Sequence, residues 1–481
     1  MHLKRAFIVA AVVAFVTSCA TNPATGRREI SWMSEAQEIS IGQEQDLLVK
    51  KEMGLYNDAA LQQYVSAIGM SLAKLSERPN LPWHFAVVDQ PAINAFALPG
   101  GYIYLTRGIL PFLDNEAELA GVLGHEIGHV TARHSAQQYT RSIGGQVGLV
   151  ALGIFVPQAR PFGDIAAQGL GVLFLKYGRD DELQADSLGA KYAVRDNWDP
   201  GGVPGMLSTL GRLDEADGQR KGVPNFLSTH PEPLLRVREI QPEVEMLRAG
   251  RTDLKRDKDA LARRLDGMVY GDSPEQGIVR GNAFLHAPLR FRLDFPNAWD
   301  IQNSAEQVVA KAPDADVFML LQGVDQPQGR DIQEIALNSM QAAGFRSLQG
   351  ERTTINGLAS YVGVYEGQLQ DLGAVRMRAA HIPHGGTVYM LAGLTAPAAF
   401  AQADNAFTTS IRSFRPLTAA EAENIRPNRI DLYVVRQGDT WAAIAERSGG
   451  GIKASTLAIM NNADPSSVPA TGSRIKIVVG G

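Results

Sequence analysis

His125-Glu126-Ile127-Gly128-His129 lies in a stretch of helical apolar periodicity that is predicted to form one helix over residues 115–138. Four residues advance an α-helix by about 400°, so the two imidazoles emerge from one face, a turn apart. This spacing can place two nitrogens on one tetrahedral zinc ion, and it brings Glu126 within reach of a water molecule at the metal. We therefore interpret His125 and His129 as metal ligands and Glu126 as general base and acid. The alternative is a helix with two ordinary histidines, which the amphipathic context of the motif disfavours.

A third protein ligand is required, because a catalytic zinc ion keeps three protein positions and one position for water. The metzincin continuation of the motif is absent, since it needs glycine and histidine where the chain has Ala132 and Ser135. His134 is also poorly aimed, because on a continuous helix it lies about 140° around the axis from His129. The remaining ligand must come from another element.

A second helix, predicted over residues 179–195, offers this ligand in Glu182. Asp186 shares its face one turn later, where it can accept the second N–H of a liganding histidine and fix the tautomer of that ring. Glu-x-x-x-Asp on a second helix is the gluzincin arrangement, and imidazole and carboxylate ligands suit zinc. The sequence therefore predicts one zinc ion per chain.

Four ordered matches over roughly residues 30–265 resemble the HtpX/BepA-like bacterial zinc metallopeptidases, relatives of the CAAX-prenyl endopeptidases. They are the segment 94–97 before Pro99-Gly100-Gly101, the helix with the His-Glu-x-x-His motif, the segment 182–186, and Ser228-Thr229-His230-Pro231. The resemblance implies a mainly helical gluzincin domain in which His125, His129 and Glu182 hold the zinc ion.

The resemblance also implies a role for His230 near the metal. This histidine either donates to the oxyanion of the tetrahedral intermediate or occupies the open metal position at rest. The alternative is a capping histidine before Pro231. For Arg236 and Arg238 we expect surface ion pairs rather than contacts that brace the site.

A substrate-binding edge is the third implication of the resemblance. Asn94, Ala95 and Phe96 are expected on the strand at the edge of the cleft. An extended peptide could add its backbone there and gain main-chain hydrogen bonds.

The beginning of the chain has the pattern of an export signal. Lys4 and Arg5 precede an apolar run over residues 6–16, which is too short to span a bilayer. The sequence Val-Thr-Ser before Cys19 resembles a lipobox, which implies cleavage before this cysteine and a lipid on it. Ala20 after the cysteine resembles the signal for the outer membrane. The alternatives are an ordinary signal peptide with a chance cysteine and a buried N-terminal strand.

Composition sets the class of protein. The chain has 481 residues, of which 45% are hydrophobic and 20% charged, so we expect a folded protein of two to four domains. The net charge of −5 comes without a long basic run, which gives no reason to expect a nucleic-acid partner. Cys19 is the only cysteine, so no intramolecular disulfide can form.

The predicted fold class is multidomain α+β. A signal peptide (1–18) and a tether (19–30) precede the metallopeptidase domain (31–266). An α+β module (278–416) and a small module (430–479) follow. Two apolar stretches, 143–156 and 165–175, are interpreted as a helical hairpin packed on the core, with a lid or lipid-contacting element as the alternative.

The interpretation of the two later modules depends on resemblance to known folds. Alternating strands and Phe295-Pro296-Asn297-Ala298-Trp299 resemble a PsbP-type fold, which offers no catalytic constellation. A strand–helix–helix–strand order that begins at residue 433 resembles the LysM module, which implies binding to the N-acetylglucosamine backbone of peptidoglycan. Gly449-Gly450-Gly451 departs from the usual LysM pattern, so glycan binding and a purely structural role both stay open.

These features together predict a zinc metalloendopeptidase, and the family resemblance implies that its substrates are misfolded or unassembled envelope proteins. It is expected in the cell envelope, facing the periplasm and anchored by the lipid on Cys19 to the outer membrane. Its expected partners are protein substrates, the membrane and, through residues 430–479, peptidoglycan. Two alternatives stay open: a peptidoglycan endopeptidase, and an envelope assembly factor or chaperone with secondary proteolysis.

Overall fold

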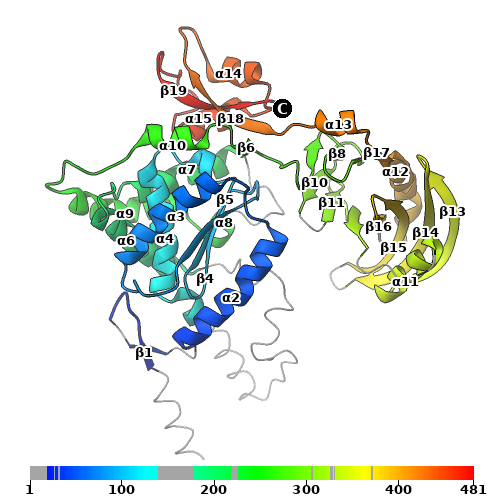
Figure 1. Ribbon diagram of the computed structural model, residues 1–481, viewed down its shortest axis with the longest axis horizontal. Coiled ribbons are helices and arrows are strands. Elements are labelled where there is room, and N and C mark those ends of the chain that lie inside the picture. Colours follow the sequence, from blue (N-terminus) through cyan, green and yellow to red (C-terminus); the bar gives the residue numbers. More distant parts are fainter. Residues whose placement is uncertain are drawn as a thin grey trace, which may run out of the picture. The chain divides into compact units, whose positions relative to one another are not determined.

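The computed structural model describes residues 19–26, 28–30, 33–138, 177–217, 226–304, 307–324, 329, 331–369 and 372–481. It divides into two compact units (Figure 1): unit 1 holds residues up to 268 together with 429–480, and unit 2 holds residues 269–428. The signal peptide predicted over 1–18 and the hairpin predicted over 143–156 and 165–175 lie outside the described residues. Among the described residues, no helix combines the length and the apolar character that crossing a membrane requires.

A small buried sheet forms one side of the peptidase part of unit 1. Its strands are β3 (His84–Val88), β5 (Tyr102–Thr106) and β4 (Ala95–Leu98), in that order, with β5 parallel to β3 and antiparallel to β4. A Pro-Gly-Gly turn connects β4 to β5. Gly100 has φ +80°, and a Cβ there would lie 2.6 Å from the Cα of Ile39, so only glycine fits this turn.

Helices build the rest of the peptidase part. They are α2 (Glu35–Glu52), α3 (Ala59–Lys74), η1 (Leu110–Phe112), α4 (Glu116–Thr131), α6 (Arg179–Arg195), α7 (Gly202–Asp217), α8 (Phe226–Thr229), α9 (Pro233–Arg248) and α10 (Lys258–Leu265). Asn115 caps α4, since its Oδ1 accepts from the backbone N–H of Glu118 at 3.0 Å. Every residue of α4 is buried, because α3, α6, α7 and β4 all pack against it. The helix with the His-Glu-x-x-His motif is thus the centre of unit 1.

The prediction of one continuous helix over residues 115–138 was wrong. Helix α4 ends at Thr131, and residues 134–138 form a new helical segment after a turn in which Arg133 has φ +60°. Two contacts hold this turn: Asn22 Nδ2 donates to the carbonyl of Ala132 at 3.1 Å, and the Arg133 guanidinium pairs with buried Glu38 of α2. Contacts from distant parts of the chain therefore interrupt a pattern that locally favours helix.

The C-terminal module belongs to the same unit. It consists of β18 (Asn428–Val434), α14 (Trp441–Ser448), α15 (Ala454–Met460) and β19 (Arg474–Val479), with β18 and β19 antiparallel. Helix α15 packs against α7 and η1. The buried ammonium of Lys476 donates to the carbonyls of Pro111 at 2.6 Å and Leu113 at 2.7 Å, just before α4 begins. This module, coloured orange to red in Figure 1, is packed on the peptidase helices.

Unit 2 is an α+β structure around an antiparallel sheet of seven strands. Their order is β10 (Asp300–Asn303), β11 (Gln307–Lys311), β12 (Val317–Gly323), β16 (Thr387–Thr395), β15 (Gly373–His384), β14 (Leu358–Leu369) and β13 (Arg346–Ile355). A second sheet contains β17 (Arg415–Pro416), β9 (Phe291–Asp294), β8 (Ala283–His286) and β7 (Ile278–Arg280). The helices are α11 (Ile332–Ala342), α12 (Phe400–Ser413) and α13 (Ala419–Glu423). The short strands β1 (Cys19–Thr21), β2 (Arg28–Ile30) and β6 (Val269–Tyr270) complete the chain.

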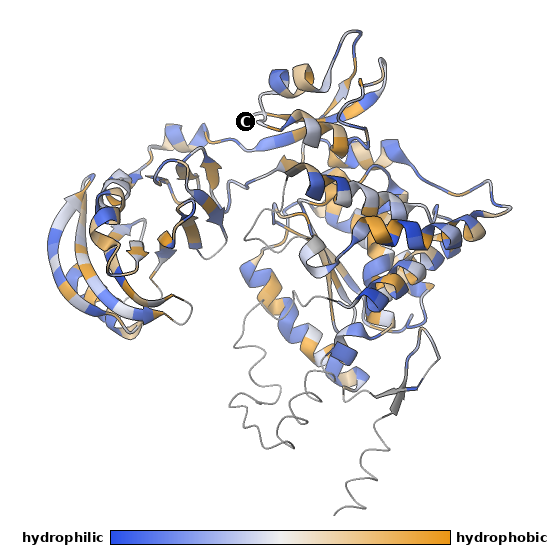
Figure 2. Ribbon diagram, turned by 180° about the vertical axis from the view of Figure 1, so that it is seen from behind, coloured by the Kyte–Doolittle hydropathy of each residue, from blue (hydrophilic) through white to orange (hydrophobic). Residues whose placement is uncertain are grey.

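Hydrophobic clusters pack on both faces of the large sheet, although strand β13 at its edge is mostly exposed. Along β15, Met377 and Ala379 enter one hydrophobic cluster, whereas Ala380 and Ile382 enter another, as expected for a strand whose side chains alternate. Hydrophilic and hydrophobic residues both occur along the strands of this sheet (Figure 2). The observed architecture, helices with several sheets in more than one unit, agrees with the predicted multidomain α+β class.

Candidate metal centre

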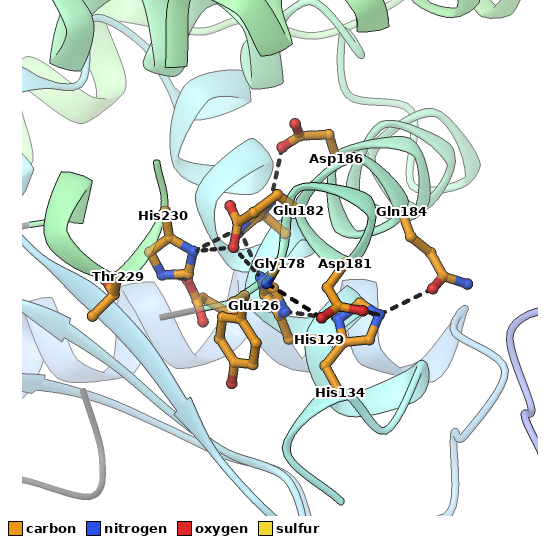
Figure 3. A network of polar contacts seen from close by, with 12 residues as sticks. Glu126, His129, His134, Gly178, Asp181, Glu182, Gln184, Asp186, Thr229 and His230 are labelled. Carbon is orange, nitrogen blue, oxygen red and sulfur yellow. Dashed lines mark hydrogen bonds and ion pairs between the residues drawn. The ribbon is translucent and has the colours of Figure 1, made fainter. Parts of the chain in front are cut away.

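Four side chains from three parts of unit 1 converge at the centre of the peptidase helices. Helix α4 contributes His125 and His129, helix α6 contributes Glu182, and His230 follows α8. One ligand atom from each of the four lies within 4.8 Å of the others, and all four residues are buried. Figure 3 shows His129, Glu182 and His230 pointing toward one another. The structure thus brings together side chains that the sequence analysis selected as site residues and that lie in separate segments of the chain.

The distances fit a tetrahedral metal ion. His125 Nε2 lies 3.0 Å from His129 Nε2 and 3.6 Å from Glu182 Oε2, and His129 Nε2 lies 3.4 Å from Glu182 Oε1. Two nitrogens bound to one tetrahedral zinc ion at about 2.0–2.1 Å stand roughly 3.3 Å apart. Lone pairs that face one another at such distances need a shared cation. The donor set therefore fits a zinc ion.

Close packing of α4 on α6 produces this convergence. A Cβ on Gly189 would lie 2.8 Å from the backbone nitrogen of His125, and one on Gly124 would lie 3.0 Å from the Cα of Gly189. The two helix backbones therefore touch beside the first histidine. Glycine is the residue that permits such an approach, and it brings the carboxylate of Glu182 to the imidazoles.

The outward nitrogen of His125 is held by Asp186. Its Nδ1 lies 2.9 Å from Asp186 Oδ1, so Nδ1 carries the proton and Nε2 presents a lone pair to the cluster. Arg236 holds this carboxylate in turn, with Nε 2.8 Å from Oδ2 and Nη2 2.6 Å from Oδ1. Although burial alone raises the pKa of Asp186, Arg236 and the His125 hydrogen bond lower it overall.

Arg236 corrects the prediction of a surface ion pair. The residue is 1% exposed, and its Nη1 also lies 2.5 Å from Glu182 Oε2. It lies on α9, which packs against α6, so its side chain reaches inward to both carboxylates. Arg238, two residues later, is exposed.

His134 is the residue whose place the sequence argument missed. It is not a member of the converging set, but its Nδ1 lies 2.8 Å from His129 Nδ1 and its Nε2 lies 3.0 Å from Gln184 Oε1. Burial lowers the pKa of His134, which favours the neutral ring. Tyr177 also lies here, stacked on His129 with ring centroids 4.0 Å apart. Only the turn at Arg133 brings His134 to this position, so the 140° argument, which assumed a continuous helix, did not apply.

Glu126 lies beside the cluster with its carboxylate unsatisfied. Both carboxylate oxygens are buried and accept no hydrogen bond from the described residues, and Oε1 lies 3.6 Å from His230 Nε2. Burial raises the pKa of this carboxyl group above its usual value of 4.5. A buried carboxylate whose pKa is raised takes up a proton more readily than a solvated one, which suits a general base and acid.

His230 joins the cluster to Glu126. Its Nδ1 lies 2.9 Å from Glu182 Oε1 and 3.3 Å from His125 Nε2, and its ring stacks on Phe226. Burial lowers the pKa of His230, but the nearby carboxylates of Glu182 and Glu126 raise it overall. The side chain lies in the cluster and is not a cap of α9, whose N-cap residue is Glu232.

The residues of the predicted substrate edge lie on or beside strand β4, and the predicted lipidation site lies on strand β1. Ala95 and Phe96 lie on β4, which pairs within the described residues only with β5 and so forms an edge of this sheet. Asn94 precedes the strand, and its Oδ1 accepts from the N–H of Ala95 at 2.9 Å. Phe96 packs in a hydrophobic cluster with Tyr104. Cys19 is the first residue of β1, and its modification stays a prediction.

Known proteins similar to this chain agree with the site. The sequence model of Peptidase family M48 matches residues 59–244, and that of the LysM domain matches residues 433–478. The Beta-barrel assembly-enhancing protease of Escherichia coli is 33% identical over 248 residues, which are 49% of this chain and 49% of that protein. The chain thus spans about half the length of this relative.

A mitochondrial relative is matched more completely. The metalloendopeptidase OMA1 of Schizosaccharomyces pombe is 31% identical over 260 residues, which are 50% of this chain and 72% of that protein. Among solved structures, cyanobacterial PsbP from Synechocystis sp. PCC 6803 is 12% identical over 29% of this chain and 95% of that chain, with a TM-score of 0.23. That score is too low to support an argument, so the PsbP-like fold of residues 278–416 stays a prediction. The chain belongs to peptidase family M48, with its peptidase domain in residues 59–244 and a LysM domain at residues 433–478.

Proposed function

We propose that this chain is a zinc-dependent metalloendopeptidase that cleaves proteins of the bacterial envelope. The observation that carries the proposal is the convergence of His125, His129 and Glu182 beside the Glu126 carboxylate, whose oxygens accept no hydrogen bond from the described residues. A purely structural metal site needs no such carboxylate, because its four positions are closed by protein ligands.

Each residue of the site has a role in peptide hydrolysis. His125, His129 and Glu182 would hold one zinc ion, which supplies a Lewis acid that lowers the pKa of water and polarises the scissile carbonyl. Glu126 takes a proton from the attacking water and passes it to the leaving amine. Asp186 keeps His125 in the tautomer that presents Nε2.

His230 governs access to the fourth position. Its Nδ1 lies 3.3 Å from His125 Nε2, where it would fill the fourth position of the metal ion at rest. Rotated away, the same ring donates to the oxygen of the tetrahedral intermediate. The two alternative roles that the resemblance implies for His230 would then be two positions of one side chain.

The substrate class follows from the relatives and the predicted export signal. A relative carries the name Beta-barrel assembly-enhancing protease. We infer that this chain acts on misfolded or unassembled envelope proteins, at the periplasmic face of the outer membrane, held there by a lipid on Cys19. Extended substrate would add along β4, beside Asn94, Ala95 and Phe96.

The test uses protein without residues 1–19, depleted of metal by a chelator and then given back one equivalent of zinc. Cleavage of an unfolded outer-membrane β-barrel protein should disappear with the metal and return with it. Cleavage that continues in the metal-free protein would contradict the proposal.

A second candidate function, peptidoglycan endopeptidase, is favoured by the LysM domain packed in the same unit as the peptidase helices. The same protein incubated with purified sacculi separates the two, since only a peptidoglycan endopeptidase releases crosslink fragments. The assembly-factor alternative would be supported if cells carrying only the Glu126→Gln protein assembled their outer membrane normally.

A further inference from the structure

His134 makes a hydrogen-bonded chain with His129 and Gln184 behind the metal centre. His134 Nδ1 lies 2.8 Å from His129 Nδ1, and His134 Nε2 lies 3.0 Å from Gln184 Oε1. Both histidines are 1% exposed. Figure 3 shows His134 and Gln184 on the side of His129 away from His230. His134 and Gln184 are therefore linked to the ring of a proposed metal ligand, His129, although neither of them is a metal ligand.

The acceptors around His134 set the direction of the protons. Its Nε2 faces Gln184 Oε1 and, at 3.9 Å, Asp181 Oδ1. A neutral imidazole has one N–H donor and one lone pair, so the nitrogen that faces oxygens carries the hydrogen. The Nδ1 of His134 is then an acceptor, and the Nδ1 of His129 must be the donor.

This direction determines which nitrogen of His129 can bind metal. With the proton on Nδ1, the lone pair of Nε2 points at the cluster, 3.4 Å from Glu182 Oε1 and 3.0 Å from His125 Nε2. The opposite direction would place an N–H of His129 where the metal must be. A partner that fixes the proton on Nδ1 thus prepares the ring before metal arrives.

We propose that His134 and Gln184 hold His129 in the tautomer that binds metal through Nε2, so that His134 is a positioning residue of the metal centre. The inference rests on the proposed function, because it assigns His129 as a zinc ligand. The turn at Arg133, with φ +60°, contributes to this arrangement, because it brings His134 back beside the preceding helix. The two liganding histidines are thus oriented by different partners, His125 by a carboxylate and His129 by a neutral ring.

The test measures zinc affinity by competition with a chromophoric chelator at about pH 8, where an imidazole is neutral. His134→Leu removes the acceptor and should weaken zinc binding by about 10- to 100-fold. His134→Asn restores an acceptor oxygen near the position of Nδ1 and should recover most of the affinity. Circular dichroism of the metal-free variants checks that the fold is kept.

Gln184→Glu tests the direction of the chain. A carboxylate can only accept, so it preserves the proposed direction, and zinc affinity should stay within about threefold of the unmodified protein. A gain in affinity would show that the chain of the unmodified protein runs in the opposite direction, because an acceptor-only partner would then have reversed it, and this result would overturn the proposal. A loss as large as that of His134→Leu would contradict the role of Gln184, and full affinity in His134→Leu would overturn the proposal as well. An unmodified protein without bound zinc would instead contradict the proposed function itself, so the two failures are distinguishable.

Discussion

One guanidinium faces two carboxylates behind the metal centre. Arg236 contacts Asp186 through two nitrogens and reaches Glu182 Oε2 through a third, all in a region closed to solvent. Burying two carboxylates is costly unless positive charge accompanies them. Arg236 supplies part of that charge, and a bound metal ion completes it.

Replacing Arg236 by methionine should therefore destabilise the metal-free protein by about 3–5 kcal/mol, because two buried carboxylates lose their partner. Zinc should restore part of this loss by adding positive charge at the same place. Urea denaturation with and without zinc measures both effects. The matched control is Arg238→Met on the same helix, where the side chain is exposed and the change should stay within about 0.5 kcal/mol. Equal effects of the two substitutions would contradict the charge argument.

The ionisation of Lys476 makes the free energy of unfolding of unit 1 depend on pH. Burial lowers the pKa of its ammonium group from 10.5 to about 8, against the opposite effect of Asp114 and Glu118. Below this pH the folded and unfolded chains both hold the proton, so the cost of burying the charge is present in full. Between about 8 and 10.5 only the unfolded chain keeps it, and Lys476 adds stability as the pH rises.

We therefore expect the free energy of unfolding of the unmodified protein, minus that of Lys476→Met, to rise by about 3 kcal/mol from about pH 7 to 10.5. Taking the difference removes the titration of the other lysines and the tyrosines. Urea denaturation of both proteins across this range measures it. A difference independent of pH would mean that the ammonium of Lys476 is not buried in solution.

At the scale of elements, the contact between α4 and α6 sets the geometry of the metal centre. Gly189→Ala would place a methyl group 2.8 Å from the backbone nitrogen of His125, so the helices must separate. The expected cost of about 1–3 kcal/mol of stability comes with weaker zinc binding, because Glu182 moves away from the imidazoles. Lys191→Ala on the same helix is the control, since it removes a surface ion pair with Glu243 and a hydrogen bond to Ser187. Zinc affinity is measured by chelator competition and the free energy of unfolding by urea denaturation. Equal values for the two variants would contradict this account.

The elements that the sequence predicted are those with strong local signals. Helix α6 has the predicted bounds, and strand β4 contains Ala95 and Phe96, which were expected on a strand. The convergence of His125, His129 and Glu182 followed from helical spacing and resemblance. The break after α4 could not be predicted, because contacts from Asn22 and Glu38 hold it.

At the scale of the whole molecule, the peptidase helices and the LysM domain form one unit although 160 residues of unit 2 separate them in the chain. Sequence patterns gave the order of the modules but not this packing. The decisive contacts join residues far apart, as where Lys476 binds the carbonyls of Pro111 and Leu113, and Arg212 of α7 binds Asn462. No local pattern shows that these side chains make contacts with residues so far away in the chain.

Unit 2 should be removable. The backbone of residues 267–268 exchanges hydrogen bonds of 2.9 and 2.8 Å with Ile430, so the two ends of unit 1 lie next to each other. Replacing residues 269–428 by a short Gly-Ser linker should leave a protein that binds zinc. It should cleave casein at a rate within about threefold of that of the unmodified protein, because a domain inserted between two neighbouring chain ends can be removed without separating them. Removing residues 429–481 instead exposes the faces of α7 and η1 and should lower the unfolding temperature. Loss of zinc binding on removal of unit 2 would contradict this division.

The assignment of His125, His129 and Glu182 as ligands and of Glu126 as base is tested most directly by one comparison. Protein lacking residues 1–19 and its Glu126→Gln variant are analysed for zinc and incubated with casein. We expect about one equivalent of zinc in both, with cleavage by the variant at least about 100-fold slower. Cleavage by the variant at the unmodified rate, or absence of metal from both proteins, would contradict the account.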